Sequence, residues 1–285
     1  MSERRAILYV VLSSLIWSTS FPAVKLGLSY FSPLTFVFLR FLLGFLIYLI
    51  FFQISKIRFP FNLFKEKGAY LLGFVTFLSY VFQFVGQKYT LASRTALIIN
   101  LFVIWVPILA VIFLKEKFHR KYLVSLFLLV PGMILLSGGR NLKQAFAQGI
   151  MLGDLIVLIA SFCWAFYVIT SKKLLEKYSS HEINAFVFLV TAVLAFPFTI
   201  HSNFKPVFNI AGLGIVLHLS LNCTVLAYYL YVTGLKHSGA IKSTIFVSLE
   251  VLFSFIVSLI VLGERWTAVE ILGGFLMLTA VFLSI

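Results

Sequence analysis

The sequence of 285 residues is 61% hydrophobic and only 11% charged, with a mean hydropathy of +1.07. A soluble domain averages about 45–50% apolar and about 25% charged residues, so a soluble globular protein, a disordered chain and a disulfide scaffold are excluded. The net charge of +14 does not indicate nucleic acid, because Lys and Arg separate apolar runs as a membrane topology requires. The expected surroundings are a lipid bilayer.

Ten apolar runs are each long enough to cross a bilayer, which takes about 20 residues as a helix. The first run follows a short basic segment and is interpreted as a spanning helix rather than a signal peptide, because nothing water-soluble follows it. The connectors are too short for an extramembrane domain. The predicted spans are 6–27, 33–54, 68–88, 94–114, 122–139, 150–171, 182–200, 209–232, 243–263 and 267–285.

Basic residues are distributed unequally between the two sets of alternate connectors. Fifteen Lys and Arg residues lie in the set that includes the N-terminus, and Arg40 lies inside the second span. The positive-inside rule therefore places both termini in the cytoplasm. The seven basic residues of the opposite set are Lys25, Lys88, Arg94, Arg140, Lys143, Lys205 and Arg265.

The two halves of the sequence match each other in register. Ser14-Leu-Ile-Trp17 recurs as Ser161-Phe-Cys-Trp164 at a shift of 147 residues. Five helices are an odd number, so a second copy enters the membrane with the opposite orientation. We therefore predict two inverted five-helix repeats, 1–145 and 146–285, an all-α construction typical of secondary transporters. Further matches are Lys25 with Lys172, and, at a shift of 148, Lys88 with Lys236, Ala92 with Ala240, Arg94 with Lys242 and Glu116 with Glu264.

Short motifs spread over the whole chain resemble the drug/metabolite transporter superfamily, specifically its EamA-type branch with ten helices in two halves. Their order and spacing carry the likeness rather than any single motif. The motifs are Trp17-Ser-Thr-Ser-Phe21 with Lys25, Arg40-Phe41, Leu114-Lys-Glu116, Gly153-Asp154, Trp164-Ala165, Gly239-Ala240, Leu249-Glu250, Leu262-Gly-Glu264-Arg265 and Gly273-Gly274.

The resemblance implies export or uptake of amino acids and related small metabolites across a prokaryotic plasma (inner) membrane, without a cofactor. The sequence departs from the family pattern at two places. Ser18 stands where Gly usually follows the Trp, and Val251 stands where Pro commonly follows the Glu. Val251 keeps the backbone hydrogen bond that a proline removes, so no hinge is expected there; Pro22 and Pro107 are candidate bending points instead.

Glu250 is the only acidic residue well inside a predicted span. A carboxylate there costs at least about 2.5 kcal/mol and faces a cavity or a partner, so Glu250 is either a ligand of a substrate amine, a proton-coupling group, or one half of an ion pair with Arg40. Arg40 itself is a structural partner, a side chain that reaches the membrane interface, or a substrate contact. Lys25 and Lys172 lie near helix ends, where they either reach the headgroups or bind a substrate carboxylate.

Uncharged polar and aromatic residues concentrate on the first, third, fourth, sixth and eighth predicted helices, which in this family resemble the cavity-lining set together with the ninth. Rings and amides together suit a small zwitterion or an aromatic amine. His218 is a candidate proton acceptor or a neutral ring bonded across helices. The predicted substrate-binding residues are Trp17, Ser20, Tyr80, Gln83, Asn100, Trp164, Tyr167, Asn222, Tyr228 and Glu250, and the coupling or gating candidates are Glu250, His218, Lys25 and Arg40.

A secondary transporter with alternating access is the function that these patterns favour. An intramembrane enzyme would need paired acids or a nucleophile with its base, a channel would need a pore-loop signature, and direct use of ATP would need a phosphate-binding loop. Cys163 and Cys223 show no metal-ligand spacing, and no metal is expected. The alternative within the superfamily is an exchanger of phosphorylated or anionic metabolites, with Lys25, Arg40 or Lys172 facing inward. The oligomeric state is a monomer or a homodimer, the latter through the fifth and tenth helices.

Overall fold

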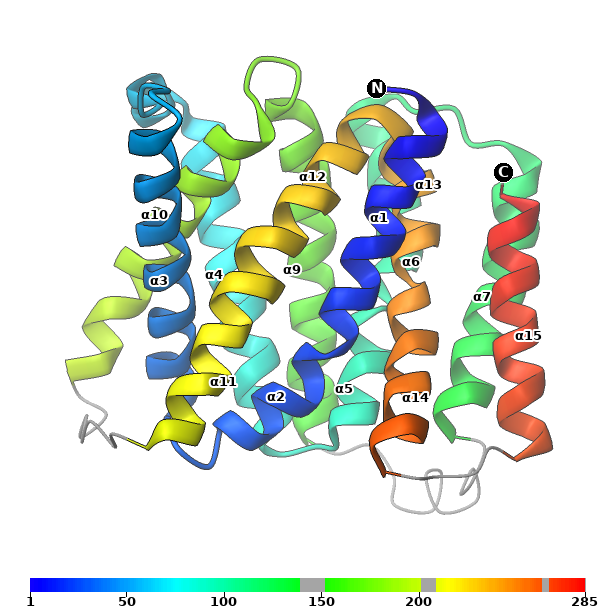
Figure 1. Cartoon of the computed structure of the whole chain (residues 1–285). Coiled ribbons are helices and arrows are strands. Elements are labelled where there is room, and N and C mark those ends of the chain that lie inside the picture. The colour runs from blue at the N-terminus through cyan, green and yellow to red at the C-terminus, as the bar shows by residue number, and fades with distance from the viewer. Residues whose placement is uncertain (139–151, 201–208, 263–266, 285) are drawn as a thin grey trace.

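The computed structural model describes residues 1–138, 152–200, 209–262 and 267–284, and over these ranges it contains helices and no strand. Nine helices of this described part are long and apolar enough to cross a membrane. They pack side by side, with the N-terminus of the first helix and the C-terminus of the last at the same end of the bundle (Figure 1). We call this end the terminal end. The boundary predicted at 145/146 and Glu264 lie outside the described residues.

The helices coincide with the predicted spans to within a few residues. The last predicted span is an apolar helix of 16 residues, shorter than the other nine. The helices of the first half are α1 (Glu3–Ser18), α2 (Ser20–Gly27), α3 (Pro33–Ile54), α4 (Lys67–Lys88), α5 (Ala92–Ile99), α6 (Phe102–Leu109) and α7 (Arg120–Gly138). Those of the second half are α9 (Leu152–Leu174), α10 (Ser180–Ile200), α11 (Ile210–Ser220), α12 (Ala227–Ser238), α13 (Ala240–Val247), α14 (Leu249–Leu262) and α15 (Ala268–Leu283).

Three of the spanning segments are interrupted near their middle. The breaks fall at Thr19 between α1 and α2, at Asn100 and Leu101 between α5 and α6, and at Ser248 between α13 and α14. Each is a tight turn with a hydrogen bond between residues three apart, such as Leu101 N to Ile98 O at 3.1 Å. None of these turns contains a proline. A broken helix exposes backbone groups and a helix end in mid-bundle, where ligands of transporters bind.

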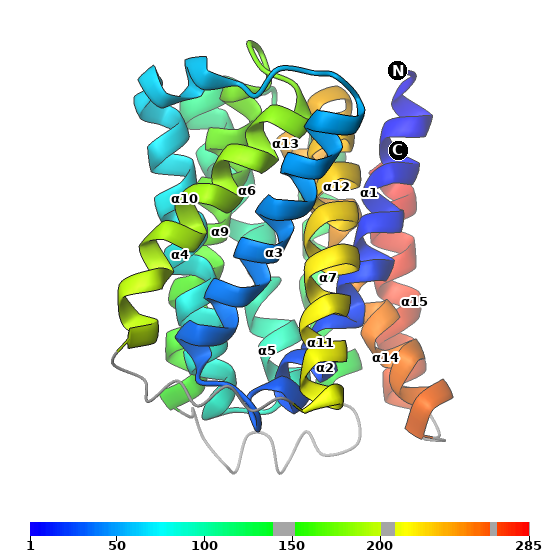
Figure 2. The same cartoon turned by 60° about the vertical axis from the view of Figure 1, so that its left-hand side comes forward.

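The principal helix contacts join the first half of the chain to the second. The pairs are α4 with α9, α1 with α12, α3 with α10 and α7 with α15 (Figures 1 and 2). Glycine allows the closest approach, because a Cβ at Gly86 would lie 2.8 Å from the carbonyl oxygen of Gly153. A Cβ at Gly234 would similarly lie 2.7 Å from the carbonyl oxygen of Ala6. The two halves are thus interleaved, and a core of buried aromatic side chains lies between them.

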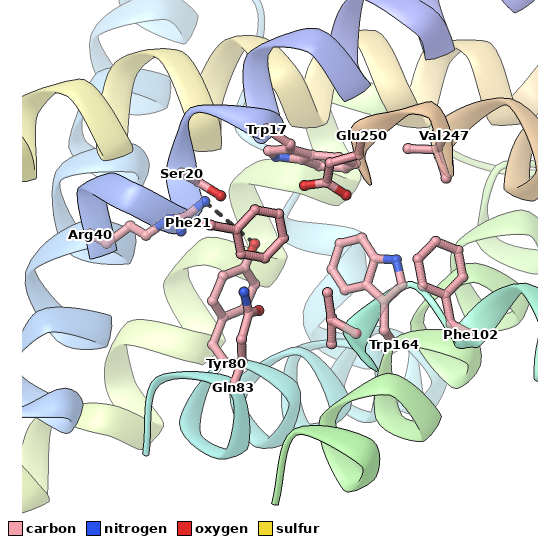
Figure 3. Close-up of a pocket in the computed structure, with 11 residues that line it drawn as sticks. Trp17, Ser20, Phe21, Arg40, Tyr80, Gln83, Phe102, Trp164, Val247 and Glu250 are labelled. Atoms are coloured by element: carbon pink, nitrogen blue, oxygen red, sulfur yellow. Dashed lines mark hydrogen bonds between the residues drawn. The ribbon is translucent and has the colours of Figure 1, made fainter. Parts of the chain in front are cut away.

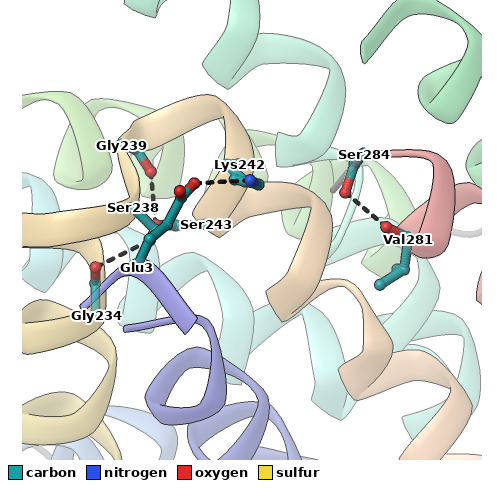
Figure 4. A network of polar contacts seen from close by, with 8 residues as sticks. All are labelled: Glu3, Gly234, Ser238, Gly239, Lys242, Ser243, Val281 and Ser284. Carbon is teal, nitrogen blue, oxygen red and sulfur yellow. Dashed lines mark hydrogen bonds and ion pairs between the residues drawn. The ribbon is translucent and has the colours of Figure 1, made fainter. Parts of the chain in front are cut away.

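Polar contacts connect helix ends at the terminal end. Lys242 Nζ of α13 pairs with Glu3 Oε1 of α1 at 2.7 Å, and the hydroxyl groups of Ser238 and Ser243 lie 2.8 Å apart across the corner between α12 and α13 (Figure 4). Gly239 makes this corner with a φ of +82°, a conformation that favours glycine. These contacts fix the first helix against the corner at which α13 begins.

Candidate functional site

A cavity lies at the level of the three helix breaks, between the two halves of the bundle. The residues around it come from α1, α2, α3, α4, α5, α6, α9, α13 and α14 (Figure 3). Six of the ten predicted substrate-binding residues line it, as does Arg40. The lining residues are Trp17, Ser20, Phe21, Arg40, Tyr80, Gln83, Ile99, Phe102, Trp164, Val247 and Glu250.

Glu250 places a carboxylate in the wall of this cavity. It occupies the first turn of α14, directly after the break at Ser248, and is only 7% exposed. The positive end of the helix dipole favours a carboxylate at this position. Among the described residues, its carboxylate accepts from the side-chain amide of Asn100, whose Nδ2 lies 3.4 Å from Oε2. Glu250 is therefore buried with one weak partner in this part of the chain.

An ion pair between Arg40 and Glu250, one of the three interpretations of Glu250, is not formed. Within the described part of the chain, no Lys or Arg lies within 4.0 Å of the Glu250 carboxylate. The Arg40 guanidinium instead donates from Nε to Thr224 Oγ1 at 2.7 Å and from Nη2 to the Cys223 carbonyl oxygen at 3.0 Å. Neutral oxygens thus hold this buried cation, and among the described residues the Glu250 carboxylate has no direct ion pair.

A π-helical segment, η3 (Leu221–Leu226), supplies the carbonyl that holds Arg40. The wider turn leaves the Cys223 carbonyl oxygen to accept from side chains, and the indole Nε1 of Trp17 also donates to it at 2.7 Å. The Arg40 guanidinium carbon lies 4.7 Å from the Tyr80 ring centre, within range of a cation–π contact. Irregular backbone of this kind recurs at functional sites.

Aromatic rings form most of the remaining wall. Trp17 and Trp164 meet edge to face with ring centres 5.6 Å apart. The hydroxyl of Tyr228 donates to that of Tyr80 at 3.0 Å, and Tyr167 stacks on Trp164 at 4.4 Å. Tyr167 and Tyr228 were predicted as substrate contacts; both lie behind this wall and neither lines the cavity.

Asn222 and His218 form a separate pair beside the break at Thr19. Asn222 Nδ2 lies 3.0 Å from His218 Nδ1, and His218 Nε2 lies 2.9 Å from Thr19 Oγ1. Because an amide nitrogen only donates, Nδ1 accepts, and Nε2–H donates to Thr19. The Thr19 hydroxyl in turn donates to Ile16 O at 2.7 Å. The arrangement suits a neutral ring bonded across helices, and neither residue lines the cavity.

Lys25 lies outside the cavity, near the end opposite the termini. Its Nζ donates to the carbonyl oxygens of Gln87 and Thr90 at 2.9 and 2.8 Å, at and just beyond the C-terminal end of α4. Lys172 does the same for α12, binding two carbonyl oxygens of its last turn at 3.0 and 2.8 Å. Cations at helix C-terminal ends are favoured by the helix dipole, so both lysines cap helices.

Sequence reasoning missed four apolar lining residues. Two are aromatic, Phe21 and Phe102, and two are aliphatic, Ile99 and Val247. In a chain with 33 Phe residues and 61% apolar content, nothing distinguishes these four from residues that face lipid or core. Only their position beside the breaks could have identified them; Pro22 follows the break at Thr19, but no proline or glycine lies next to the breaks at Asn100 and Ser248.

A bundle of apolar helices with a central cavity at helix breaks is typical of a membrane transporter. Comparison with known families agrees: the model of the EamA-like transporter family matches residues 4–138 and again 151–285. The chain belongs to the EamA-like transporter family. The two matches together cover almost the whole chain.

Relatives along the full length carry transporter names. An uncharacterized transporter of Archaeoglobus fulgidus is 28% identical over 97% of this chain and 96% of its own length. The uncharacterized transporter YyaM of Bacillus subtilis is 26% identical over 94% and 89%. A protein of Escherichia coli named "Probable amino-acid metabolite efflux pump" is 22% identical over 100% and 96%. A solved crystal structure has the same fold, with a TM-score of 0.79 at 16% identity over 99% of this chain and 96% of its own.

Proposed function

We propose that this protein is a secondary transporter that moves amino acids or related small amines across a prokaryotic plasma membrane, in the direction of export. The observation that carries the proposal is the buried Glu250 carboxylate, which lines the cavity and forms no ion pair with any described Lys or Arg. A substrate ammonium group would supply the missing positive charge. The name of the Escherichia coli relative supports the choice of amino-acid metabolites and of export.

The walls of the cavity suit the rest of such a substrate. The rings of Trp17, Phe102 and Trp164 offer apolar and cation–π contact to an organic amine. Gln83 and Ser20 offer hydrogen bonds that can orient the polar end. A charged ligand inside the membrane needs hydrogen bonds and cation–π contacts, because its hydration shell is lost there.

The alternative, an exchanger of phosphorylated or anionic metabolites, requires cations that face the cavity. Of the three candidates, only Arg40 lines it, and three neutral oxygens already accept from its guanidinium. Lys25 and Lys172 cap helix ends instead. This arrangement favours an amine over an anion.

The proposed mechanism is alternating access by two inverted five-helix repeats, with α15 as the tenth span and both termini cytoplasmic. Three findings support the repeats: the family model matches twice, the breaks at Asn100 and Ser248 lie 148 residues apart, and each principal helix pair joins one half to the other. Rocking of one half against the other would expose the central cavity to each side in turn. The excess of Lys and Arg on the terminal side supports the orientation.

Uptake into proteoliposomes with purified protein tests this function. Pooled labelled amino acids are offered at two pH gradients to the natural protein, to Glu250→Gln and to the control Glu66→Gln, whose carboxylate lies outside the cavity beside Lys177. We expect saturable uptake that falls at least about ten-fold in Glu250→Gln, since removing a buried charge pair costs more than 1.4 kcal/mol. Uptake of phosphorylated solutes in place of amino acids would overturn the amine assignment.

A further inference from the structure

Three pairs of aromatic residues that the predicted repeats make equivalent touch each other in the middle of the bundle. Two equivalent residues of inverted repeats can meet only where the axis that relates the repeats passes between them. The axis therefore runs through this aromatic layer, beside the cavity. The pairs, each 147 or 148 residues apart, are Trp17 with Trp164, Phe41 with Phe188 and Tyr80 with Tyr228.

Pairs of equivalent residues, such as Ile99 with Val247, line the cavity beside this layer, but the cavity extends further on the side away from the terminal end. One helical turn beyond Trp17 and Tyr80, away from the terminal end, lie Ser20 and Gln83, and both line the cavity (Figure 3). The small side chain of Ser20 and the flexible side chain of Gln83 leave space at these two positions. The cavity thus extends toward α2 and the C-terminal half of α4.

Phenol rings occupy the equivalent positions on the other side of the layer. The equivalents of Ser20 and Gln83 are Tyr167 and Tyr231, and both tyrosines are 0% exposed. Tyr167 stacks on Trp164, and Tyr231 packs 5.2 Å from Trp17, measured between ring centres. These two rings fill the space that would correspond to the cavity.

This difference between the halves matters because two identical inverted repeats would give no preference for opening to either end of the bundle. If the two halves were identical, the state open to one end would be the symmetry-related copy of the state open to the other, with the same free energy. Any preference for one state must therefore come from positions where the halves differ. Beside the axis, Ser20 with Tyr167 and Gln83 with Tyr231 are such positions.

We propose that Tyr167 and Tyr231 close the central site toward the terminal end and set the end from which it is accessible. The proposal rests on the inverted-repeat mechanism given above. In the resting protein the site is reached from the end opposite the termini, past Ser20 and Gln83. Release toward the terminal end requires both phenol rings to leave the aromatic layer.

Cysteine reporters at two equivalent positions measure this sidedness without any substrate. In a background with Cys163→Ala and Cys223→Ala, Ala96→Cys reports the side of Ser20 and Thr244→Cys reports the side of Tyr231; both native residues are buried. The probe is a charged methanethiosulfonate applied to protein in lipid nanodiscs, where both ends are open to solvent. We expect Ala96→Cys to react at least about ten-fold faster than Thr244→Cys, a preference of about 1.4 kcal/mol.

Replacing Tyr167 and Tyr231 by their smaller equivalents tests whether these two rings close the terminal side. Tyr167→Ser with Tyr231→Gln is expected to raise the rate at Thr244→Cys at least about ten-fold. Tyr48→Ser, which removes an equally buried tyrosine between α3 and α10, is the matched control and leaves the rate unchanged. An unchanged rate in the double variant, or an equal rise in the control, overturns the proposal.

The reverse exchange keeps the proposal testable where loss of two core tyrosines prevents folding. Ser20→Tyr with Gln83→Tyr fills the cavity and is expected to slow the reaction at Ala96→Cys at least about ten-fold. An unchanged rate there contradicts the proposal. Because the reporters need no transported solute, a failure of the amino-acid assignment leaves these outcomes unaffected, and the two can be told apart.

Discussion

Gly86 of α4 and Gly153 of α9 bring two helix backbones into direct contact. A Cβ at position 153 would lie 2.5 Å from the carbonyl oxygen of Gly86 and 2.8 Å from the backbone carbon of Tyr89. Backbone atoms cannot move aside as a flexible side chain can. The crossing between the two halves of the chain therefore depends on the absence of a side chain at this point.

Gly153→Ala is predicted to destabilise the protein by at least about 1–3 kcal/mol, the usual cost of overpacking. Gly214→Ala in α11 is the matched control, because no atom lies within 4 Å of the Cβ it would gain. Alanine favours a helix there by about 1 kcal/mol. Thermal unfolding in detergent should therefore show a lower midpoint temperature for Gly153→Ala but not for Gly214→Ala. Equal midpoints would mean that the helices are not in contact at Gly153.

Thr224→Val is predicted to destabilise the protein by about 1.5–3 kcal/mol, the range for a hydrogen bond to a charged group. The substitution keeps the shape of the side chain but removes the oxygen that accepts from Arg40 Nε at 2.7 Å. Thr76→Val is the control, since that buried hydroxyl bonds only to Leu72 O of its own helix. A similar loss in both variants, measured by thermal unfolding, would show that Arg40 does not depend on Thr224.

Lys25→Met and Lys172→Met are each predicted to lower stability by about 0.3–1 kcal/mol, the worth of a cation at a helix C-terminal end. The KM for the transported solute should stay within about two-fold of that of the natural protein, because a lysine outside the cavity does not contact the bound solute. Uptake and thermal unfolding of the same preparations separate the two effects. A large rise in KM at unchanged stability would instead place these lysines on the substrate.

His218→Gln is predicted to leave the pH dependence of uptake unchanged. Both ring nitrogens already have partners, Asn222 at Nδ1 and Thr19 at Nε2, and the ring lies outside the cavity. Such a ring has no access to a proton that travels with the substrate. Uptake measured between pH 5 and 8, the range in which an ordinary histidine titrates, checks this; loss of the pH dependence would make His218 the coupling group.

The positions of the helices could be predicted from the sequence because hydrophobicity over about 20 residues is the signal that a bilayer selects. The span 33–54, for example, is the helix Pro33–Ile54. The break at Thr19 lies one turn before Pro22, a predicted bending point, because a proline ring clashes with the carbonyl group four residues earlier, here that of Ser18. The breaks at Asn100 and Ser248 could not be predicted. Pro131 and Pro197 lie inside continuous helices, whereas no proline lies in or directly after the turn at Ser248. Neighbouring helices can support an irregular turn that the local sequence does not signal.

The polar residues that line the cavity could also be predicted, because a charged or amide side chain inside a span is costly unless it faces a cavity or a partner. This logic found Glu250, Gln83 and Arg40, which all line the cavity. It could not separate Tyr80, which lines the cavity, from Tyr228, which lies behind it, because the two equivalent tyrosines differ only in which side of the aromatic layer is open. Whether a tyrosine lines the cavity depends on the packing between the two halves, and the sequence of a single helix does not indicate it.

Equilibrium binding to the purified protein tests the central claim, that Glu250 holds the ammonium group of the substrate, most directly. The probe is a pool of radiolabelled amino acids, challenged with an excess of the same amino acids or of their N-acetyl derivatives, which lack the ammonium group. We predict that free amino acids displace the label at least about ten-fold better than the acetylated ones, and that Glu250→Gln removes this difference while Glu66→Gln keeps it. Equal displacement by both sets, or full discrimination in Glu250→Gln, would contradict the account.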